Sequence, residues 1–362
     1  DFFDYIMANR PWQKPLFLNY CTYWTVTATR DNIVKLIKEL DEKLLSKYNI
    51  TFDSFQIDAG WDDHKTIWQV NKEKFPDGLH TIQTTLRCAS INIGLWMSPS
   101  GCYAKHQWGP DLEWATAHGY EVSAQPEHIC LGGTNYLRDV KKNIIDIVKE
   151  YNVVHLKLDS YRCWCDQSDH GHEPGLLSGE PIAQGLVDYF TEVRNAAPDI
   201  LLELTCNPPA PSPWWLFYVD SIYDMGTGGA DSPAGRVPCP VYKESATTAR
   251  DYYNLQWAGL MPIPPVTQDL LGIIHQTNEE LMNDAVTSLM RGPSFIPMYV
   301  NPKRMDDARW GKLAGLIEWA RQNSLTLRNT YPLQPESWQN KADIPQGSRF
   351  SPMPREIYGY MH

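Results

Sequence analysis

Residues 153–162 read Val-Val-His-Leu-Lys-Leu-Asp-Ser-Tyr-Arg. A nearly continuous apolar run of this kind is typical of a strand that is buried on both faces of a parallel sheet. The run ends in Asp159, and Lys157 lies two positions earlier, so both side chains point to the same face of the strand. Functional side chains converge at the carboxyl ends of such strands. The segment therefore predicts a parallel α/β fold with chemistry at this strand end.

Similar short runs recur along the chain, and helical patterns lie between most of them. There are eight such runs, and the alternation of strand and helix predicts a closed (β/α)8 TIM barrel. The interval between the fifth and sixth runs is short, which predicts a reduced or missing helix there. The expected strands are residues 16–20, 52–57, 91–99, 153–159, 200–205, 218–223, 255–262 and 294–299.

The expected helices are amphipathic, with apolar residues repeating every three or four positions. Asp31 is the expected N-cap of the first helix, which runs to Leu45. Pro198 ends the helix before the fifth strand, and Gly292 with Pro293 ends the helix before the last strand. The helical patterns cover residues 33–45, 79–86, 140–148, 186–193, 281–289 and 310–320.

The composition indicates a large packed core, because 43% of the 362 residues are hydrophobic and 21% are charged. A formal net charge of −11 at pH 7 argues against nucleic acid or an anionic membrane as the main partner. No apolar run reaches the roughly 18 residues of a membrane-spanning helix. Residues 1–10 carry no signal-peptide pattern, and a chain that begins at Asp1 is expected to be processed or excised. We favour a secreted or periplasmic protein and leave its oligomeric state open.

The character of the chain changes after Thr330. Several prolines then interrupt any helix, and the final residues are typical of a strand that is cut off. We expect residues 1–330 to form the barrel. Residues 331–362 are expected to form a Pro-rich linker and the beginning of a truncated C-terminal β-sandwich, so that the chain is a fragment.

The eight cysteines do not form an obvious framework. No two of them have CxxC spacing, and the single residue between Cys163 and Cys165 is poor spacing for zinc. We therefore expect no metal site and no cofactor. If the protein is secreted, a disulfide between Cys102 and Cys130, or one that involves Cys163 or Cys165, remains open.

Carboxylates and indoles also lie at the neighbouring strand ends. Asp58 and Trp61 follow the second strand, and a carboxylate beside an aromatic wall suits a sugar. The ammonium of Lys157 keeps Asp159 ionised, which suits a nucleophile. The competing interpretations are a structural Lys157–Asp159 pair that closes the barrel, a capping role for Asp58, and indoles that fill the core.

A glycosidase that uses two carboxylates needs a partner for Asp159. Asp220, Asp224 and Asp231 follow or end the sixth strand. We interpret Asp220 as structural. Asp231 follows the glycine-rich loop 226–229, which has the conformational freedom to carry a carboxylate over the pocket. We favour Asp231 as the acid/base and keep Asp224, at the strand end, as the alternative.

Three motifs in this order resemble a known family. They are Gln-Ile-Asp-Ala-Gly-Trp (56–61), Gly-Leu-Trp-Met-Ser-Pro (94–99) and Lys-Leu-Asp (157–159). Together they resemble the α-galactosidase clan of retaining glycoside hydrolases, and most of all glycoside hydrolase family 36. The resemblance spans about residues 15–330 and implies a TIM-barrel hydrolase without a metal or other cofactor.

The resemblance implies a role for each matching residue. It implies that Asp159 is the nucleophile, that Lys157 is a cation that binds the sugar, and that Asp58 holds sugar hydroxyls. Trp61 and Trp96 are implied to line the pocket for the terminal sugar, and an Asp at strand six to be the acid/base. The other candidate substrate-binding residues are Arg162, Cys206 and Asn207.

The chain departs from the family pattern at three places. The family usually has Asp-Asp-Gly-Trp, whereas position 59 here is Ala. The sixth strand has Ile222-Tyr-Asp-Met in place of Trp-x-Ser-Asp, and residues 205–209 lack the usual glycine-rich run. These departures affect the choice of sugar and of acid/base.

The expected function is that of a retaining exo-α-glycosidase. It hydrolyses terminal α-galactosides or α-N-acetylgalactosaminides by double displacement. The alternatives are a carbohydrate-binding barrel that has lost catalysis and a transglycosidase similar to raffinose synthases. A carbohydrate substrate is the expected partner in each case.

Overall fold

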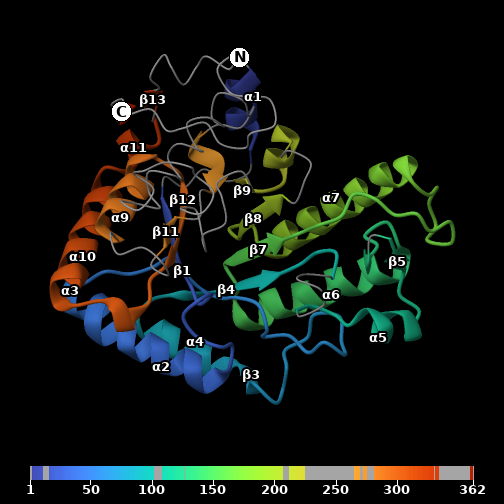
Figure 1. Ribbon diagram of the computed structural model, residues 1–362, viewed down its shortest axis with the longest axis horizontal. Coiled ribbons are helices and arrows are strands. Elements are labelled where there is room, and N and C mark those ends of the chain that lie inside the picture. Colours follow the sequence, from blue (N-terminus) through green and yellow to red (C-terminus); the bar gives the residue numbers. More distant parts are fainter. Residues whose placement is uncertain are drawn as a thin grey trace, which may run out of the picture.

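A computed structural model describes residues 2–10, 16–101, 108–125, 127–206, 212–224, 265–269, 272–274, 281–329, 331–333 and 359–361. Its centre is a curled, nine-stranded parallel sheet with helices on the outside (Figure 1). The strands follow the order β10-β9-β8-β7-β4-β2-β1-β12-β11. They are β1 (Phe17–Cys21), β2 (Ser54–Ile57), β4 (Asn92–Met97), β7 (His155–Asp159), β8 (Leu201–Cys206), β9 (Ser221–Asp224), β10 (Gln268–Asp269), β11 (Ile273–Ile274) and β12 (Phe295–Tyr299).

The two edge strands of this sheet, β10 and β11, follow one another in the sequence. β10 pairs with β9, and β11, which begins four residues after β10 ends, pairs with β12. The two short strands therefore occupy the place of a seventh barrel strand between β9 and β12. This confirms the predicted α/β barrel. The strand expected at 255–262 lies outside the described residues, and β10 and β11 hold the position that it was expected to take.

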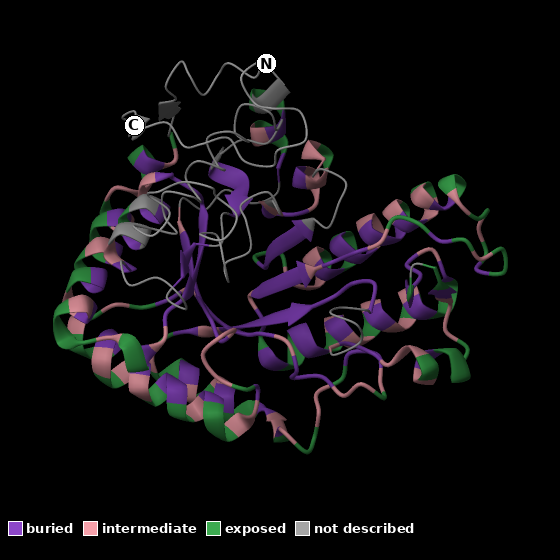
Figure 2. Cartoon of the chain, in the orientation of Figure 1, coloured by how far each residue is buried: buried purple, intermediate pink, exposed green. Residues whose placement is uncertain are grey.

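The strands are buried, as their apolar runs predict. All five residues of β1 and of β12 are buried, and so are the four of β2. Figure 2 shows the buried residues concentrated on the strands and on the inward faces of the surrounding helices. Burial of the apolar side chains between sheet and helices is the main source of stability in such a fold.

The outer helices confirm the predicted alternation. After β9, α9 and α10 come before and after β12, the last strand of the barrel sheet (Figure 1). The helices are α1 (Phe2–Asn9), α2 (Arg30–Leu40), α3 (Ser46–Tyr48), α4 (His80–Cys88), α5 (Leu112–Ala117), α6 (Thr134–Tyr151), α7 (Gly179–Ala196), α9 (Leu281–Met290), α10 (Asp307–Gln322) and α11 (Ser324–Leu327).

Two local details differ from the expectation for the first helix. Thr29, not Asp31, is the N-cap, and its hydroxyl accepts a hydrogen bond from the Asn32 amide at 3.4 Å. Asp31 lies in the first turn, where its charge favours the positive end of the helix dipole. The expected helix to Leu45 does continue, but residues 41–45 form a π-helical turn before α3.

Short elements complete the described part of the chain. In the described residues between β8 and β9 the chain forms a 3-10 turn (Pro213–Phe217), in agreement with the reduced helix expected there. Further 3-10 turns are Leu176–Ser178, Pro265–Thr267 and Pro302–Arg304. The remaining strands are β3 (Pro76–Leu79), β5 (Val122–Ala124), β6 (Glu127–Ile129), β13 (Tyr331–Leu333) and β14 (Gly359–Met361), of which β5 pairs with β6 and β13 with β14, both antiparallel.

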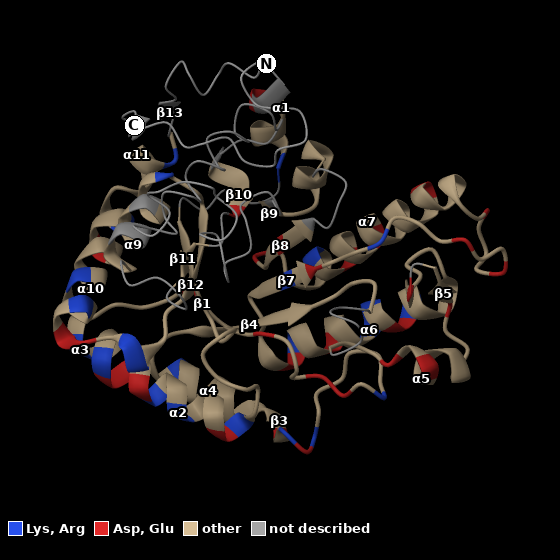
Figure 3. Cartoon of the chain, in the orientation of Figure 1, with Lys and Arg blue, Asp and Glu red and all other residues tan. Residues whose placement is uncertain are grey.

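Figure 3 shows that many of the charged residues belong to the surrounding helices, for example α2, α6 and α10. Among the described residues, no helix combines the length and the apolar character needed to cross a membrane. The barrel strands carry few charged residues, and Lys157 and Asp159 of the predicted site are among them.

Candidate active site

The carboxylate of Asp159 is held by two neighbouring strands. The indole Nε1–H of Trp96, on β4, donates to Oδ2 at 3.1 Å. The hydroxyl of Thr205, on β8, donates to Oδ1 at 2.5 Å. Asp159 itself is the last residue of β7. Each carboxylate oxygen thus accepts one hydrogen bond that fixes its direction, and each keeps acceptor capacity for a ligand.

The backbone turns sharply just after this carboxylate. Ser160 has φ of 55°, a left-handed conformation that is uncommon for a residue with a side chain. Its amide donates to Thr205 Oγ1 at 3.2 Å, and its carbonyl accepts from Ser98 Oγ at 2.9 Å. Strain of this kind costs about 1–3 kcal/mol and is held in place by such surrounding bonds.

Asp58 lies at the end of β2 and is almost fully buried. Its Oδ2 accepts hydrogen bonds from Gln56 Nε2 at 3.0 Å and from Cys21 Sγ at 3.2 Å, while Oδ1 accepts from the Ala59 amide at 2.8 Å. The ammonium of Lys157 is 3.7 Å from Oδ2. This bonding fixes the carboxylate in a buried place where an unpaired charge would be unfavourable.

Lys157 lies two residues before Asp159 on β7, and its ammonium pairs with Asp58. Its ammonium donates to the hydroxyl of Tyr299 at 3.3 Å and lies 5.7 Å from the centre of that ring. Burial alone would lower the pKa of Lys157, but Tyr299 and Asp58 outweigh it and hold that pKa well above its usual value. The site therefore contains a permanent buried cation.

A third carboxyl group, that of Glu203 on β8, is fully buried in the barrel. His155 Nε2 is 3.0 Å from its Oε2. Burial, with a contribution from Lys157, lowers the pKa of His155 to about 3, so the imidazole that contacts Glu203 is neutral. Burial raises the pKa of Glu203 to about 7. No pattern in the sequence singled out Glu203 or Thr205, because each looks like an ordinary polar residue in a strand.

A pocket of about 460 Å³ opens beside Asp58. Aromatic rings on its walls include Trp24 and Trp108, and Trp24 has a left-handed φ of 63°. Trp108 is also in edge contact with Trp96, with ring centres 6.3 Å apart, which links the pocket to Asp159. The pocket is lined by Thr22, Tyr23, Trp24, Thr25, Val26, Thr27, Ala28, Asp58, Ala59, Gly60, His64, Lys74 and Trp108.

Two predicted sugar-binding residues have other contacts. Trp61 is fully buried against Trp68, and its Nε1–H donates to the carbonyl oxygen of Trp96 at 2.7 Å. In this structure Trp61 supports the strand that carries Trp96. Arg162 is half-buried, and its backbone amide donates to Ser100 Oγ at 2.8 Å.

The acid/base prediction falls largely outside the described residues. Asp231 and Asn207 are not among them, and of Cys206 and Asp224 only the backbones are described, as paired residues at the ends of β8 and β9. Asp220 is structural, as expected. Its carboxylate accepts from Arg194 at 2.7 Å and from the Leu202 amide at 2.8 Å.

The disulfides left open by the sequence do not form. Cys130, Cys163 and Cys165 are all free thiols. Cys102 lies outside the described residues, but its suggested partner Cys130 is free.

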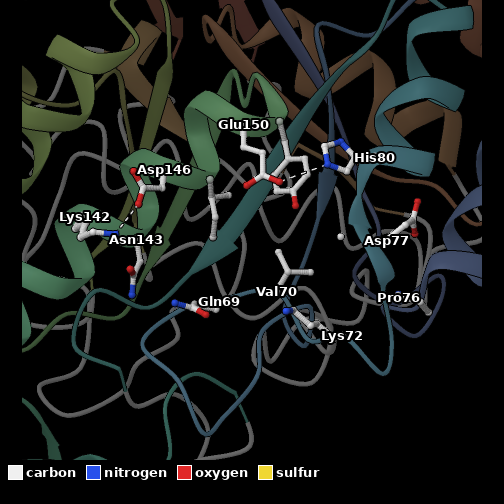
Figure 4. A pocket seen from close by; sticks show the side chains of 13 residues that line it. Gln69, Val70, Lys72, Pro76, Asp77, His80, Lys142, Asn143, Asp146 and Glu150 are labelled. Carbon is white, nitrogen blue, oxygen red and sulfur yellow. Dashed lines mark hydrogen bonds and ion pairs between the residues drawn. The ribbon is translucent and has the colours of Figure 1, made fainter.

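A second pocket, of about 490 Å³, lies on the flank of the barrel between α6 and the segment that precedes α4 (Figure 4). Ion pairs cross its lining, with Lys142 bonded to Asp146 at 2.8 Å and His80 3.4 Å from Glu150. None of the predicted site residues lines it, so the pocket beside Asp58 is the candidate active site.

No protein-family model matches the chain. It is 25% identical over 170 residues to the α-galactosidase Mel36A of Lactobacillus acidophilus, which covers 42% of this chain and 22% of that protein. A family 36 α-galactosidase AgaA of Geobacillus stearothermophilus, solved with stachyose, has a TM-score of 0.66 at 12% identity, covering 90% of this chain and 44% of that one. The galactosidase domain of the α-galactosidase–sucrose kinase AgaSK has a TM-score of 0.64 at 16% identity, covering 88% and 42%.

The chain spans less than half the length of these three relatives. The likeness to the two solved structures is one of fold. The chain thus has the fold of the catalytic barrel of the family 36 α-galactosidases, in agreement with the resemblance of its strand-end motifs.

Proposed function

We propose that the barrel is the catalytic domain of a retaining exo-α-glycosidase that removes terminal α-galactosyl residues. One observation carries the proposal. The carboxylate of Asp159 is held by Trp96 and Thr205 at the end of β7. A buried cation and a second, firmly bonded carboxylate, the pair of Lys157 on β7 and Asp58 after β2, come from the same parallel sheet. A nucleophile next to groups that grip sugar hydroxyls is the arrangement that glycoside cleavage needs.

In the proposed reaction, a carboxylate oxygen of Asp159 attacks the anomeric carbon and forms a glycosyl ester. The bond from that carbon to the leaving oxygen breaks, and the acid gives its proton to this oxygen. The same residue, now a base, takes a proton from water as the water oxygen attacks the anomeric carbon. The ester bond breaks and Asp159 recovers its charge. Two inversions give net retention.

Asp58 and Lys157 are proposed to bind the hydroxyls of the terminal sugar. Their mutual bonds fix their positions before substrate arrives, so little ordering remains for binding. The aromatic pocket beside Asp58 offers faces on which a sugar ring can stack. Ala59 leaves one side of this pocket without a carboxylate. Whether the sugar carries a hydroxyl or an N-acetyl group at C2 is part of the test.

The deciding experiment is trapping with an activated fluoro-galactosyl inhibitor, followed by peptide mapping. We expect an ester on Asp159 and no label in Asp159→Asn. A label on another carboxylate would reassign the nucleophile. Aryl α-galactosides and aryl α-N-acetylgalactosaminides, compared side by side, define the sugar. Binding of sugar without turnover of either would favour the non-catalytic alternative. Transfer to a sugar acceptor in place of water would favour the transglycosidase.

The acid/base and the stereochemistry have separate tests. We expect Asp231→Ala to slow glycosides with poor leaving groups far more than activated aryl glycosides, and azide to restore part of the second step. Asp224→Ala is the matched comparison, and the same behaviour there instead would move the role to Asp224. NMR should find the α-anomer as first product. The β-anomer would contradict retention.

A further inference from the structure

Two cysteines and two histidines form a cluster at a place that the proposed reaction does not use. They are Cys130, Cys165, His170 and His172, and one ligand atom from each lies within 4.8 Å of all the others. Cys130 Sγ is 3.2 Å from His172 Nε2, and Cys165 Sγ is 3.2 Å from His170 Nδ1. The sequence pattern predicts no metal site. The cluster is not recognisable from residue spacing, because its members come from two segments that the fold brings together.

The geometry suits a four-coordinate ion. Zinc binds thiolate sulfur at about 2.3 Å and imidazole nitrogen at about 2.0–2.1 Å, so ligand atoms of a tetrahedral site lie about 3.3–3.8 Å apart. The two measured pairs are close to that range, and the widest separations need to shorten by about 1 Å. Cys130, Cys165 and His170 are buried, and His172 is partly buried. A set of two thiols and two imidazoles is typical of structural zinc.

The surroundings of His172 prepare it for such a role. Its Nδ1 is 2.9 Å from the carbonyl oxygen of Glu173, which can only accept, so Nδ1 carries the proton. The other nitrogen, Nε2, then presents its lone pair towards Cys130. This is how the outer partners of a metal-bound histidine fix its tautomer. Gly132 allows the ring to approach, because a Cβ there would be 2.7 Å from His172 Cδ2.

The cysteines are also held in position. The amide of Cys165 donates to Ser178 Oγ at 2.8 Å, and its carbonyl accepts from the Gly175 amide at 2.8 Å. The amide of Cys130 donates to the carbonyl oxygen of Glu121 at 2.7 Å, and the carbonyl oxygen of Cys130 accepts from the Gly133 amide at 3.1 Å. Both cysteines thus have backbones that are fixed by hydrogen bonds before an ion binds.

We propose that Cys130, Cys165, His170 and His172 bind one Zn²⁺ in a closed, tetrahedral, structural site. Each thiol releases its proton when its sulfur binds the ion, and neither sulfur is oxidised. With all four positions taken by the protein, no position is open to substrate. The ion joins the segment between β6 and α6 to the loop that leaves β7 directly after Asp159. It therefore fixes the path of residues 160–178 at the rim of the candidate active site.

The first test is the metal content of the full chain, purified from zinc-supplemented cells without chelators. We expect about one zinc per chain by elemental mass spectrometry. Cys165→Ser and His170→Gln should each lower the zinc content at least severalfold. Cys163→Ser is the matched control, since Cys163 is two residues from Cys165 but exposed and outside the cluster, and it should keep its zinc. Equal zinc in the wild type, Cys165→Ser and His170→Gln would overturn the assignment.

A second test does not depend on whether the variants fold. Wild-type chain is stripped with a chelator under reducing conditions and titrated with Co²⁺ alone. We expect the absorption of tetrahedral cobalt with thiolate charge-transfer bands at one ion per chain, and their loss when Zn²⁺ is added. Zn²⁺ should also protect two thiols from a thiol reagent and raise the melting temperature. No cobalt spectrum, or a Cys130–Cys165 disulfide in protein isolated without reductant, would refute the zinc site.

Discussion

Replacement of Asp159 by asparagine separates the chemistry of its carboxylate from its place in the fold. The Asn carbonyl can accept the hydrogen bond from Trp96, which now goes to Oδ2 at 3.1 Å. The Asn amide then faces Thr205. That hydroxyl can rotate to accept, and it can donate to the carbonyl oxygen of Leu158, 3.2 Å away. Both bonds are thus replaced by neutral ones, and we expect a change in the free energy of unfolding of only about 1 kcal/mol.

Turnover should respond very differently. Without the attacking oxygen the covalent route is lost, and loss of a nucleophile typically lowers kcat by 10³-fold or more, about 4 kcal/mol of barrier. The assay is hydrolysis of an aryl α-galactoside, with urea unfolding of the same samples as the control. Near wild-type kcat would refute the nucleophile. A loss of stability above about 3 kcal/mol would indicate that Asp159 closes the barrel as a structural charge.

Three further expectations concern stability. Thr205→Val should lower the free energy of unfolding by about 1.5–3 kcal/mol, because Asp159 Oδ1 loses its donor; Thr205→Ser keeps the donor, and an equal loss there would contradict the reasoning. Folded Glu203 keeps a proton that the unfolded chain releases between its usual pKa of 4.5 and about 7, so wild-type stability falls as pH rises through this window. The free energy of unfolding of Glu203→Gln, relative to wild type, should therefore increase by about 3 kcal/mol as the pH rises through this window, measured by urea unfolding at several pH values. A difference that stayed constant with pH would contradict the raised pKa of Glu203. Gly315→Ala, with open space around its Cβ on α10, should stabilise by about 0.5–1 kcal/mol. Gly185→Ala on α7 should destabilise by about 2 kcal/mol, because its Cβ would collide with the carbonyl oxygen of Leu131; thermal melts that gave both the same sign would contradict this.

Much of the barrel is predictable because its strands carry strong local signals. The run that ends in Asp159 is apolar, buried and followed by a turn, and it was placed correctly as β7. The strand expected at residues 255–262 lies outside the described residues, and β10 and β11 were not expected because two-residue strands are too short for any hydrophobic period to be recognised. The N-cap was expected at Asp31, but Thr29 is also a good cap and has the extended backbone that a cap requires.

Some residues of the candidate site can likewise be predicted from the sequence, and others cannot. Asp58 follows β2 and Asp159 ends β7, so the sequence alone predicts them at one rim. Thr205 could not be identified, because its role depends on the distance between two strands that are 46 residues apart in sequence. The zinc ligands were missed because Cys130 lies 35 residues from Cys165 and the histidines follow with unfamiliar spacing. Contacts between distant segments leave no mark in local periodicity.

Among the described residues, the barrel wall has its shortest ladders at its two edge strands, β10 and β11, and no ladder joins these two to each other. The ladder between β7 and β8 has five paired residues there, whereas β9 with β10 and β11 with β12 have two each. The free energy of a local opening increases with the number of bonds and packed groups that it breaks. Amide hydrogens of β10 and β11 should therefore exchange with solvent through small, frequent openings, and those of β7 and β8 only when the whole domain unfolds. The circumference of the barrel can therefore change at the smallest energetic cost at β10 and β11, while the strands that carry Asp58 and Asp159 stay paired with their neighbours.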